Sequence, residues 1–135
     1  MSDQEIKKIL EKSKTIAIVG VSSEKKGEDP KKLKRKPANV VMKYMQDFGY
    51  KVIPVNPFAE GEIINGEKVV KDLEDIKMPI DIVDVFRPSN ETPIIAEKAV
   101  KVKTKVLWLQ FGIDNIDAKK ISENSNIYYL SLIHI

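Results

Sequence analysis

The chain has 135 residues, the size of one domain, and 42% of them are hydrophobic while 32% are charged, which predicts a globular fold rather than disorder. No apolar run approaches the ~18 residues of a membrane span, and the N-terminus lacks a signal-peptide core, so we expect a cytoplasmic protein. The lack of Cys excludes disulfides, thiolate nucleophiles and Cys-based zinc sites, and the single His134 disfavours metal cages and a Ser–His–Asp triad.

Positive charge is concentrated in one segment. The chain carries 23 basic and 20 acidic residues, for a net charge of +3. Residues 24–36 alone hold seven basic and three acidic side chains, so the rest of the chain is nearly neutral. Such a segment is more often a charged stretch exposed to water, but the pattern also fits a segment that binds an anionic partner.

Apolar runs alternate with amphipathic stretches along the chain. We expect helices at residues 2–12, 37–48, 89–101 and 114–123, a helical turn at 72–76, and strands at 14–20, 50–55, 68–70, 80–86, 105–110 and 127–133. Ser2 and Ser89 are the expected N-caps of the first and third helices. Strands that alternate with helices predict an α/β, Rossmann-like, doubly wound three-layer sandwich with a mostly parallel sheet of five to six strands.

The expected organisation is one domain with short additions at both ends. Residues 1–13 form an N-terminal helix, 14–125 the Rossmann-like domain, and 126–135 a C-terminal strand or tail. The abrupt apolar end, LSLIHI, is typical of a truncated or foreign reading frame, so we give His134 no role. A sheet edge left uncovered there would favour a homo-oligomer.

Residues suited to an anionic ligand follow the carboxyl ends of the expected parallel strands. In doubly wound folds, ligands bind at these ends, near the point where the strand order reverses. The residues there are Gly20, Val21 and Ser22 after the first strand, Asn56 and Pro57 after the second, Phe86 and Arg87 after the fourth, and Gln110 after the fifth. None is acidic, so this rim predicts an anionic ligand rather than a metal.

The fingerprint of a nicotinamide or flavin dinucleotide site is incomplete. That fingerprint needs G-x-G-x-x-G directly before a helix, but only Gly20 matches, and Ser22 stands where the second Gly should be. The second strand ends in Val55, Asn56 and Pro57 and lacks the acidic residue that would hold a ribose hydroxyl. A dinucleotide ligand is therefore disfavoured.

Several segments together carry a family resemblance. They are IAIVGVSS at 16–23, KPANVVMKYMQDFGYKVIPVNP at 36–57, INGEKVVKDLEDI at 64–76, DIVDVFRPSN at 81–90 and VLWLQFGI at 106–113. The chain resembles the small CoA-binding-domain proteins, stand-alone relatives of the CoA-binding part of the succinyl-CoA synthetase alpha subunit. The resemblance implies a Rossmann-like domain that binds coenzyme A (CoA), as such or as an acyl-CoA, by its ADP part.

The resemblance also implies a role for each residue of the rim. The turn that meets the phosphates would consist of Gly20, Val21 and Ser22, and Lys36 would pair with a phosphate. The adenosine would be bordered by Asn56 and Pro57. The site would be closed by Phe86 and Arg87 and lined by Gln110. This set agrees with the residues themselves, because CoA carries a pyrophosphate and a 3′-phosphate and needs several cationic or N–H contacts.

No catalytic set can be assembled from the sequence. Asp81 and Asp84 are an odd number of residues apart on one expected strand, so they point to opposite faces and do not form a carboxylate pair. We therefore expect a non-catalytic CoA-binding module. The alternatives are an NAD(P)- or nucleotide-dependent enzyme and an accessory subunit of an acyl-CoA synthetase. Nucleic-acid binding through residues 24–36 is disfavoured, because no aromatic platform accompanies the charge.

Overall fold

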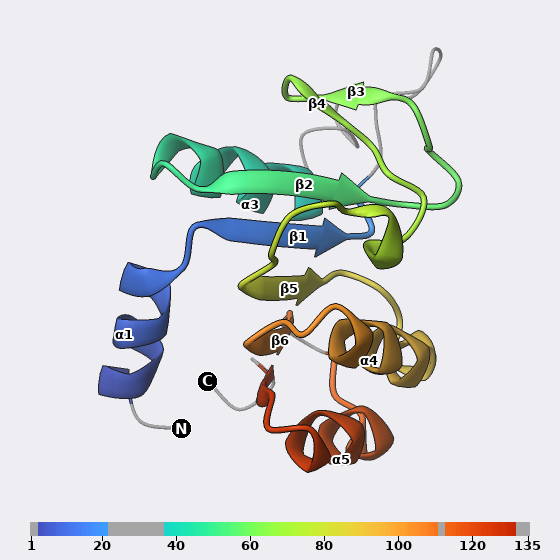
Figure 1. Cartoon of the computed structure of the whole chain (residues 1–135). Coiled ribbons are helices and arrows are strands. Elements are labelled where there is room, and N and C mark those ends of the chain that lie inside the picture. The colour runs from blue at the N-terminus through green and yellow to red at the C-terminus, as the bar shows by residue number, and fades with distance from the viewer. Residues whose placement is uncertain (1–2, 22–36, 111–112, 132–135) are drawn as a thin grey trace.

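A five-stranded parallel sheet forms the centre of the computed structural model, which describes residues 3–21, 37–110 and 113–131. The strand order is β2-β1-β5-β6-β7, every neighbouring pair is parallel, and the arrowheads of β1, β2 and β5 point the same way in Figure 1. The strands are β1 (Thr15–Val19), β2 (Lys51–Val55), β5 (Ile82–Val85), β6 (Val106–Leu109) and β7 (Tyr128–Ser131). The α/β, Rossmann-like architecture expected from the sequence is confirmed.

Four α-helices flank this sheet in the described part of the chain. They are α1 (Asp3–Lys12), α3 (Pro37–Asp47), α4 (Thr92–Lys101) and α5 (Ile116–Asn124). Two 3₁₀ turns, η1 (Leu73–Asp75) and η2 (Ser89–Glu91), precede β5 and α4 respectively. None of the described helices is long and apolar enough to cross a membrane.

Successive side chains of each strand point to opposite faces of the sheet, and helices cover both faces. In β1, Ala17 and Val19 pack on the face covered by α4 and α5, whereas Ile16 and Ile18 pack on the face covered by α1 and α3. Small residues let α4 and α5 lie close to the sheet and to each other; they are Ala96, Ala99 and Ala118, each with no exposed surface. Figure 1 shows α4 and α5 side by side.

Two local expectations were wrong. The strand expected at 68–70 is not part of the central sheet: β3 (Ile63–Ile64) and β4 (Glu67–Lys68) form a small antiparallel hairpin, and Val70 makes only an isolated bridge to Val55. Ser89 is not the N-cap of a helix, because α4 begins at Thr92, whose hydroxyl donates to the Ser89 carbonyl at 2.7 Å.

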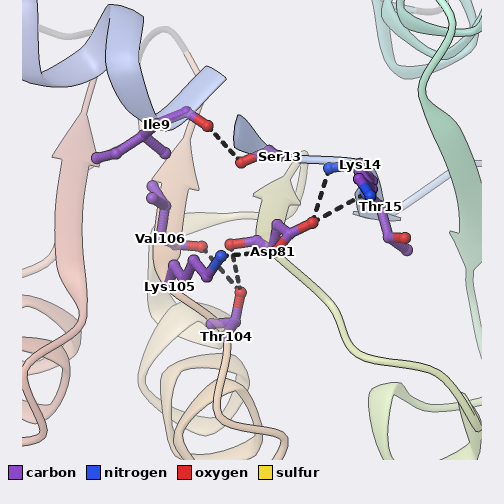
Figure 2. A network of polar contacts seen from close by, with 8 residues as sticks. All are labelled: Ile9, Ser13, Lys14, Thr15, Asp81, Thr104, Lys105 and Val106. Carbon is purple, nitrogen blue, oxygen red and sulfur yellow. Dashed lines mark hydrogen bonds and ion pairs between the residues drawn. The ribbon is translucent and has the colours of Figure 1, made fainter. Parts of the chain in front are cut away.

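Asp81 ties together the amino ends of three strands (Figure 2). Its carboxylate accepts hydrogen bonds from the backbone N–H groups of Lys14 and Thr15, at 2.7 and 3.1 Å, and pairs with the Lys105 ammonium at 3.2 Å. Burial opposes ionisation of Asp81, but these contacts outweigh it and hold the pKa of the carboxyl below its ordinary value. Asp81 therefore has a structural role at the end of the sheet opposite the strand ends expected to bind a ligand.

Candidate functional site

A cavity of about 260 Å³ lies at the carboxyl ends of β1 and β2, and we call it the switch-point cavity. The chain runs from β1 to the neighbouring β2 and then crosses to β5 on the other side of β1, so the strand order reverses between β1 and β5. Ligands of doubly wound folds bind at this position. The cavity is lined by Val19, Gly20, Val55, Asn56, Pro57, Phe58, Lys71, Asp72, Leu73, Arg87, Glu91, Ile94, Ile95 and Lys98.

Gly20 directly follows β1 and lines the switch-point cavity. Its N–H donates to the Val55 carbonyl at 2.9 Å, and its φ of +109° is in the region that favours glycine. A Cβ at this position would lie 2.8 Å from the Phe86 carbonyl oxygen and 3.2 Å from Cδ of Arg87. Only glycine therefore lets the ends of β1 and β5 approach this closely.

The side chain of Asn56 holds the two loops at the cavity in place. Its Nδ2 donates to the Val21 carbonyl at 3.0 Å, and its Oδ1 accepts from the Phe58 N–H at 2.9 Å. These bonds use both polar atoms of a buried side chain, so Asn56 positions the turn after β1 and the turn after β2 relative to each other.

Basic side chains outnumber acidic ones in the cavity wall. Arg87 pairs with Glu91, four residues later, at 2.8 Å, and Lys98 pairs with Asp72 at 2.6 Å. Lys71 is exposed and makes no ion pair with a described residue. Both carboxylates of the wall are thus neutralised, and one positive charge remains.

The pair of Lys98 and Asp72 is partly shielded from water. Burial opposes ionisation of Asp72, but the Lys98 ammonium outweighs it and holds the pKa of the Asp72 carboxyl below its ordinary value. Asp72 therefore carries its negative charge at neutral pH and keeps Lys98 against the wall of the cavity.

Apolar side chains form the remaining walls. Leu73 is buried at the start of η1, and Ile94 and Ile95 project from the first turn of α4. Phe58 is 85% exposed at the rim. An aromatic side chain left in water beside apolar walls is suited to contact with a flat ring. The cavity thus combines a surface for a planar apolar group with a cationic mouth.

The residues proposed from the sequence divide into three groups. Gly20, Asn56, Pro57 and Arg87 line the switch-point cavity. Val21 and Phe86 stand beside it, since Val21 is fully buried and gives its carbonyl to Asn56, and Phe86 packs on the face of α1 and α3. Ser22 and Lys36, with the basic segment 24–36, lie outside the described residues.

Gln110 does not line the switch-point cavity. It lies on the other face of the sheet, where its Nε2 donates a hydrogen bond to the carboxylate of Asp84. Asp84 is only 3% exposed, and burial, partly offset by this hydrogen bond, raises its pKa from 3.8 to about 7. Asp84 and Asp81 have no shared partner, which agrees with their odd spacing.

Sequence reasoning missed the part of the wall that comes from η1 and α4. Arg87 and Glu91 are four residues apart, a spacing that indicates an ion pair on a helix, so Glu91 could have been found. Lys98 and Asp72 are 26 residues apart, and no sequence signal links them. Among the described residues, no cluster of three or more His, Cys, Asp or Glu side chains is placed to hold a metal.

Comparisons with known proteins agree with this architecture. A model of the family described as CoA binding domain matches residues 14–132. The chain is 42% identical over 117 residues to the uncharacterized protein YneT of Bacillus subtilis, covering 87% of this chain and 78% of that protein.

Several solved structures are also similar to this chain. A Thermus thermophilus protein has a TM-score of 0.84 at 35% identity, and the match covers 97% of this chain and 91% of that one. A hypothetical protein from Pyrococcus horikoshii has a TM-score of 0.84 at 34% identity, and the match covers 97% of this chain and 84% of that one. A Rex-family repressor, RSP, in complex with β-NADH is similar in fold alone, with a TM-score of 0.61 at 19% identity over 96% and 59%. The chain therefore belongs to the CoA binding domain family.

Proposed function

We propose that this protein binds CoA, or an acyl-CoA, through the ADP part, with the adenosine in the switch-point cavity and the phosphates at its cationic mouth. The protein acts in this proposal as a binding module. Membership of the CoA binding domain family supports this ligand class, and so does the chemistry of the cavity.

The observation that carries the proposal is the pairing of apolar walls with a net positive mouth at the reversal of strand order. Leu73, Ile94 and Phe58 offer apolar surface to a purine ring. Arg87 and Lys71 offer cationic groups to phosphates, and one charge-assisted hydrogen bond contributes about 1.5–3 kcal/mol.

The backbone at Gly20 lines the cavity without a side chain. A Cβ there would lie 2.8 Å from the Phe86 carbonyl oxygen, so glycine lets the ends of β1 and β5 meet closely at the cavity. At the end of β2, Asn56 stands where a dinucleotide site has an acidic residue, and its amide is already used to position the loops. This difference favours CoA over NAD.

Thermal denaturation with added ligand tests the proposal. At about 100 times its dissociation constant, CoA should add about 2.7 kcal/mol to the free energy of unfolding and raise the melting temperature. NAD and NADP should do much less, and dephospho-CoA should be intermediate if basic residues hold the 3′-phosphate. Equal stabilisation by NAD and CoA would contradict the proposal.

Arg87→Ala should raise the dissociation constant for CoA about tenfold or more, because it removes a charge-assisted contact at the mouth. Lys101→Ala is the matched control, because Lys101 is a basic residue of α4 that pairs with Glu74 at 3.4 Å and does not line the cavity. Calorimetric titration of both variants measures the two constants. Equal loss in both would mean that general charge, rather than the site, attracts CoA.

A further inference from the structure

A second cavity, of about 300 Å³, lies on the opposite face of the sheet between α3 and the strands β5 and β6, and we call it the α3 groove. Its walls are almost entirely apolar; they include Leu10, Ile16, Val41, Met45, Ile82 and Trp108. Asp84 and Gln110 provide its carboxyl and amide groups, and Trp108 contributes a buried indole N–H. The groove is distinct from the switch-point cavity, with which it shares no lining residue.

The polar end of the groove lies at the rim of the sheet that carries the proposed CoA site. Gln110 directly follows β6, and Asp84 is the last but one residue of β5, so both lie near the carboxyl ends of their strands. In the sheet, β5 alone separates β1 from β6. Two strand spacings, about 10 Å, separate Gly20 from Gln110 along the rim. Because the two cavities lie on opposite faces of the sheet, the arm between the phosphates and the thioester has to pass over the rim as well as along it.

The apolar part of the groove runs away from this rim, along the strands. In the register of β5 and β6, Gln110 lies beside Phe86. The far wall of the groove includes Ile82, which is four residues before Phe86. Four residues of a strand span about 13 Å. A straight eight-carbon chain, with C–C bonds of about 1.5 Å, is somewhat shorter than that and fits lengthwise.

The outer wall of the groove is exposed to water. Val40 and Tyr44 of α3 line it and are 56% and 59% exposed, although both are largely apolar. Tyr44 also contacts the ring of Phe48, one turn later, with the ring centroids 4.7 Å apart. An apolar ligand in the groove would remove such surface from water, which is favourable.

We propose, on the basis of the proposed CoA site, that the α3 groove receives the acyl group of an acyl-CoA, and that it prefers an uncharged straight chain of about eight carbons. The thioester lies at the polar end beside Gln110, and the chain lies along the apolar wall. The apolar walls disfavour an acyl group that ends in a carboxylate, because burial of a charge without a partner is costly.

Calorimetric titration of the full chain with CoA, octanoyl-CoA and succinyl-CoA tests the proposal. Burial of each methylene group contributes at most about a fourfold gain in affinity, so partial burial of the chain should make octanoyl-CoA bind at least tenfold more tightly than CoA. Succinyl-CoA should show no gain over CoA. If CoA binds and octanoyl-CoA binds no better, the groove proposal is wrong and the CoA site stands; if neither binds, both are wrong.

A pair of variants locates the chain. Val40→Glu places a charge in the wall of the groove and should reduce the ratio of the two dissociation constants, for CoA and octanoyl-CoA, to near one. Ile116→Glu is the matched control, because Ile116 is an apolar residue of α5, 62% exposed, that lines neither cavity, and it should keep the wild-type ratio. A tenfold gain that persists in Val40→Glu would overturn the proposal.

Sedimentation equilibrium of the same proteins tests another occupant of the groove, a second copy of the chain. We expect the molecular mass of the wild type to be the same with and without octanoyl-CoA and the same as that of Val40→Glu. A dimer that Val40→Glu dissociates and octanoyl-CoA leaves intact would assign the groove to self-association and overturn the proposal.

Discussion

The ends of β1 and β5 approach each other closely because residue 20 is a glycine and has no side chain. Gly20→Ala should lower the free energy of unfolding by about 1–3 kcal/mol, because its φ of +109° strains an L-residue and the new Cβ meets the backbone oxygen of Phe86 at 2.8 Å. It should also weaken CoA binding at least tenfold. Urea denaturation and calorimetric titration measure the two effects.

Gly61→Ala separates backbone strain from crowding. Gly61 also has a positive φ, of +85°, but a Cβ there would have no neighbour within 4 Å, and the residue does not line the cavity. Its alanine variant should lose some stability and keep the wild-type affinity for CoA. If Gly61→Ala weakens CoA binding as much as Gly20→Ala, the crowding between residue 20 and the end of β5 is not the cause.

Asp84 should make stability depend on pH in an unusual direction. Because burial raises its pKa from 3.8 to about 7, the folded protein keeps a proton that the unfolded chain releases between about pH 4 and pH 7. Its contribution is therefore favourable at low pH and is lost as the pH rises through that window. Relative to wild type, Asp84→Asn should gain up to about 1.4 kcal/mol per pH unit between pH 5 and 7.

Urea denaturation at several pH values measures this gain, with Asp75→Asn as the control for removal of an exposed carboxylate. A constant difference between wild type and Asp84→Asn from pH 5 to 8 would mean that the carboxyl of Asp84 titrates normally.

At the scale of single residues, the sequence led to some of the residues that line the switch-point cavity and missed others. Gly20, Asn56, Pro57 and Arg87 were expected from the rule that ligands bind at strand ends, and all four line one cavity. That rule does not say to which face a side chain turns, so Gln110 was placed with the others although it points to the opposite face.

At the scale of elements, the amino ends of β1, β5 and β6 depend on Asp81. Asp81→Asn should lower the free energy of unfolding by about 1–3 kcal/mol near pH 7, because it weakens the bonds to two backbone N–H groups and removes the ion pair with Lys105. The pKa of Asp81 is lowered on folding, so its contribution is present above the ordinary pKa of 3.8 and is lost as the pH falls through the folded value.

Denaturant titrations at pH 7 and pH 3 test this prediction. The difference between wild type and Asp81→Asn should shrink at the lower pH, whereas CoA affinity at pH 7 should be close to that of wild type, because Asp81 lies at the amino ends of the strands. A loss of stability that is equal at both pH values would show that the charge of Asp81 is unimportant.

Elements with a strong apolar pattern were predicted well, and irregular ones were not. The strands β1, β2, β5 and β6 are the buried runs that the sequence shows, because both faces of these strands are apolar, whereas the edge strand β7 is partly exposed. The strand expected at 68–70 failed because Val69 is buried in the core although only Val70 pairs with the sheet, through one isolated bridge to Val55. Such burial leaves the same apolar signal in the sequence.

At the scale of the whole molecule, the reversal of strand order sets the position of the site. Helices α4 and α5 cover one face and α3 the other, as right-handed crossovers on the two sides of β1 require, and α1, which precedes β1, covers the same face as α3. The alternation of strands and helices was enough to predict this layering. It could not predict the two cavities, because each depends on side chains that come together only through the tertiary fold.

The most direct test of the account is a calorimetric titration of the full-length protein with CoA, with NAD as the comparison. The account predicts saturable heat with one CoA per chain, a dissociation constant in the micromolar range, and much weaker binding of NAD. No heat on addition of CoA to the folded protein, or binding of NAD as tight as that of CoA, would contradict it.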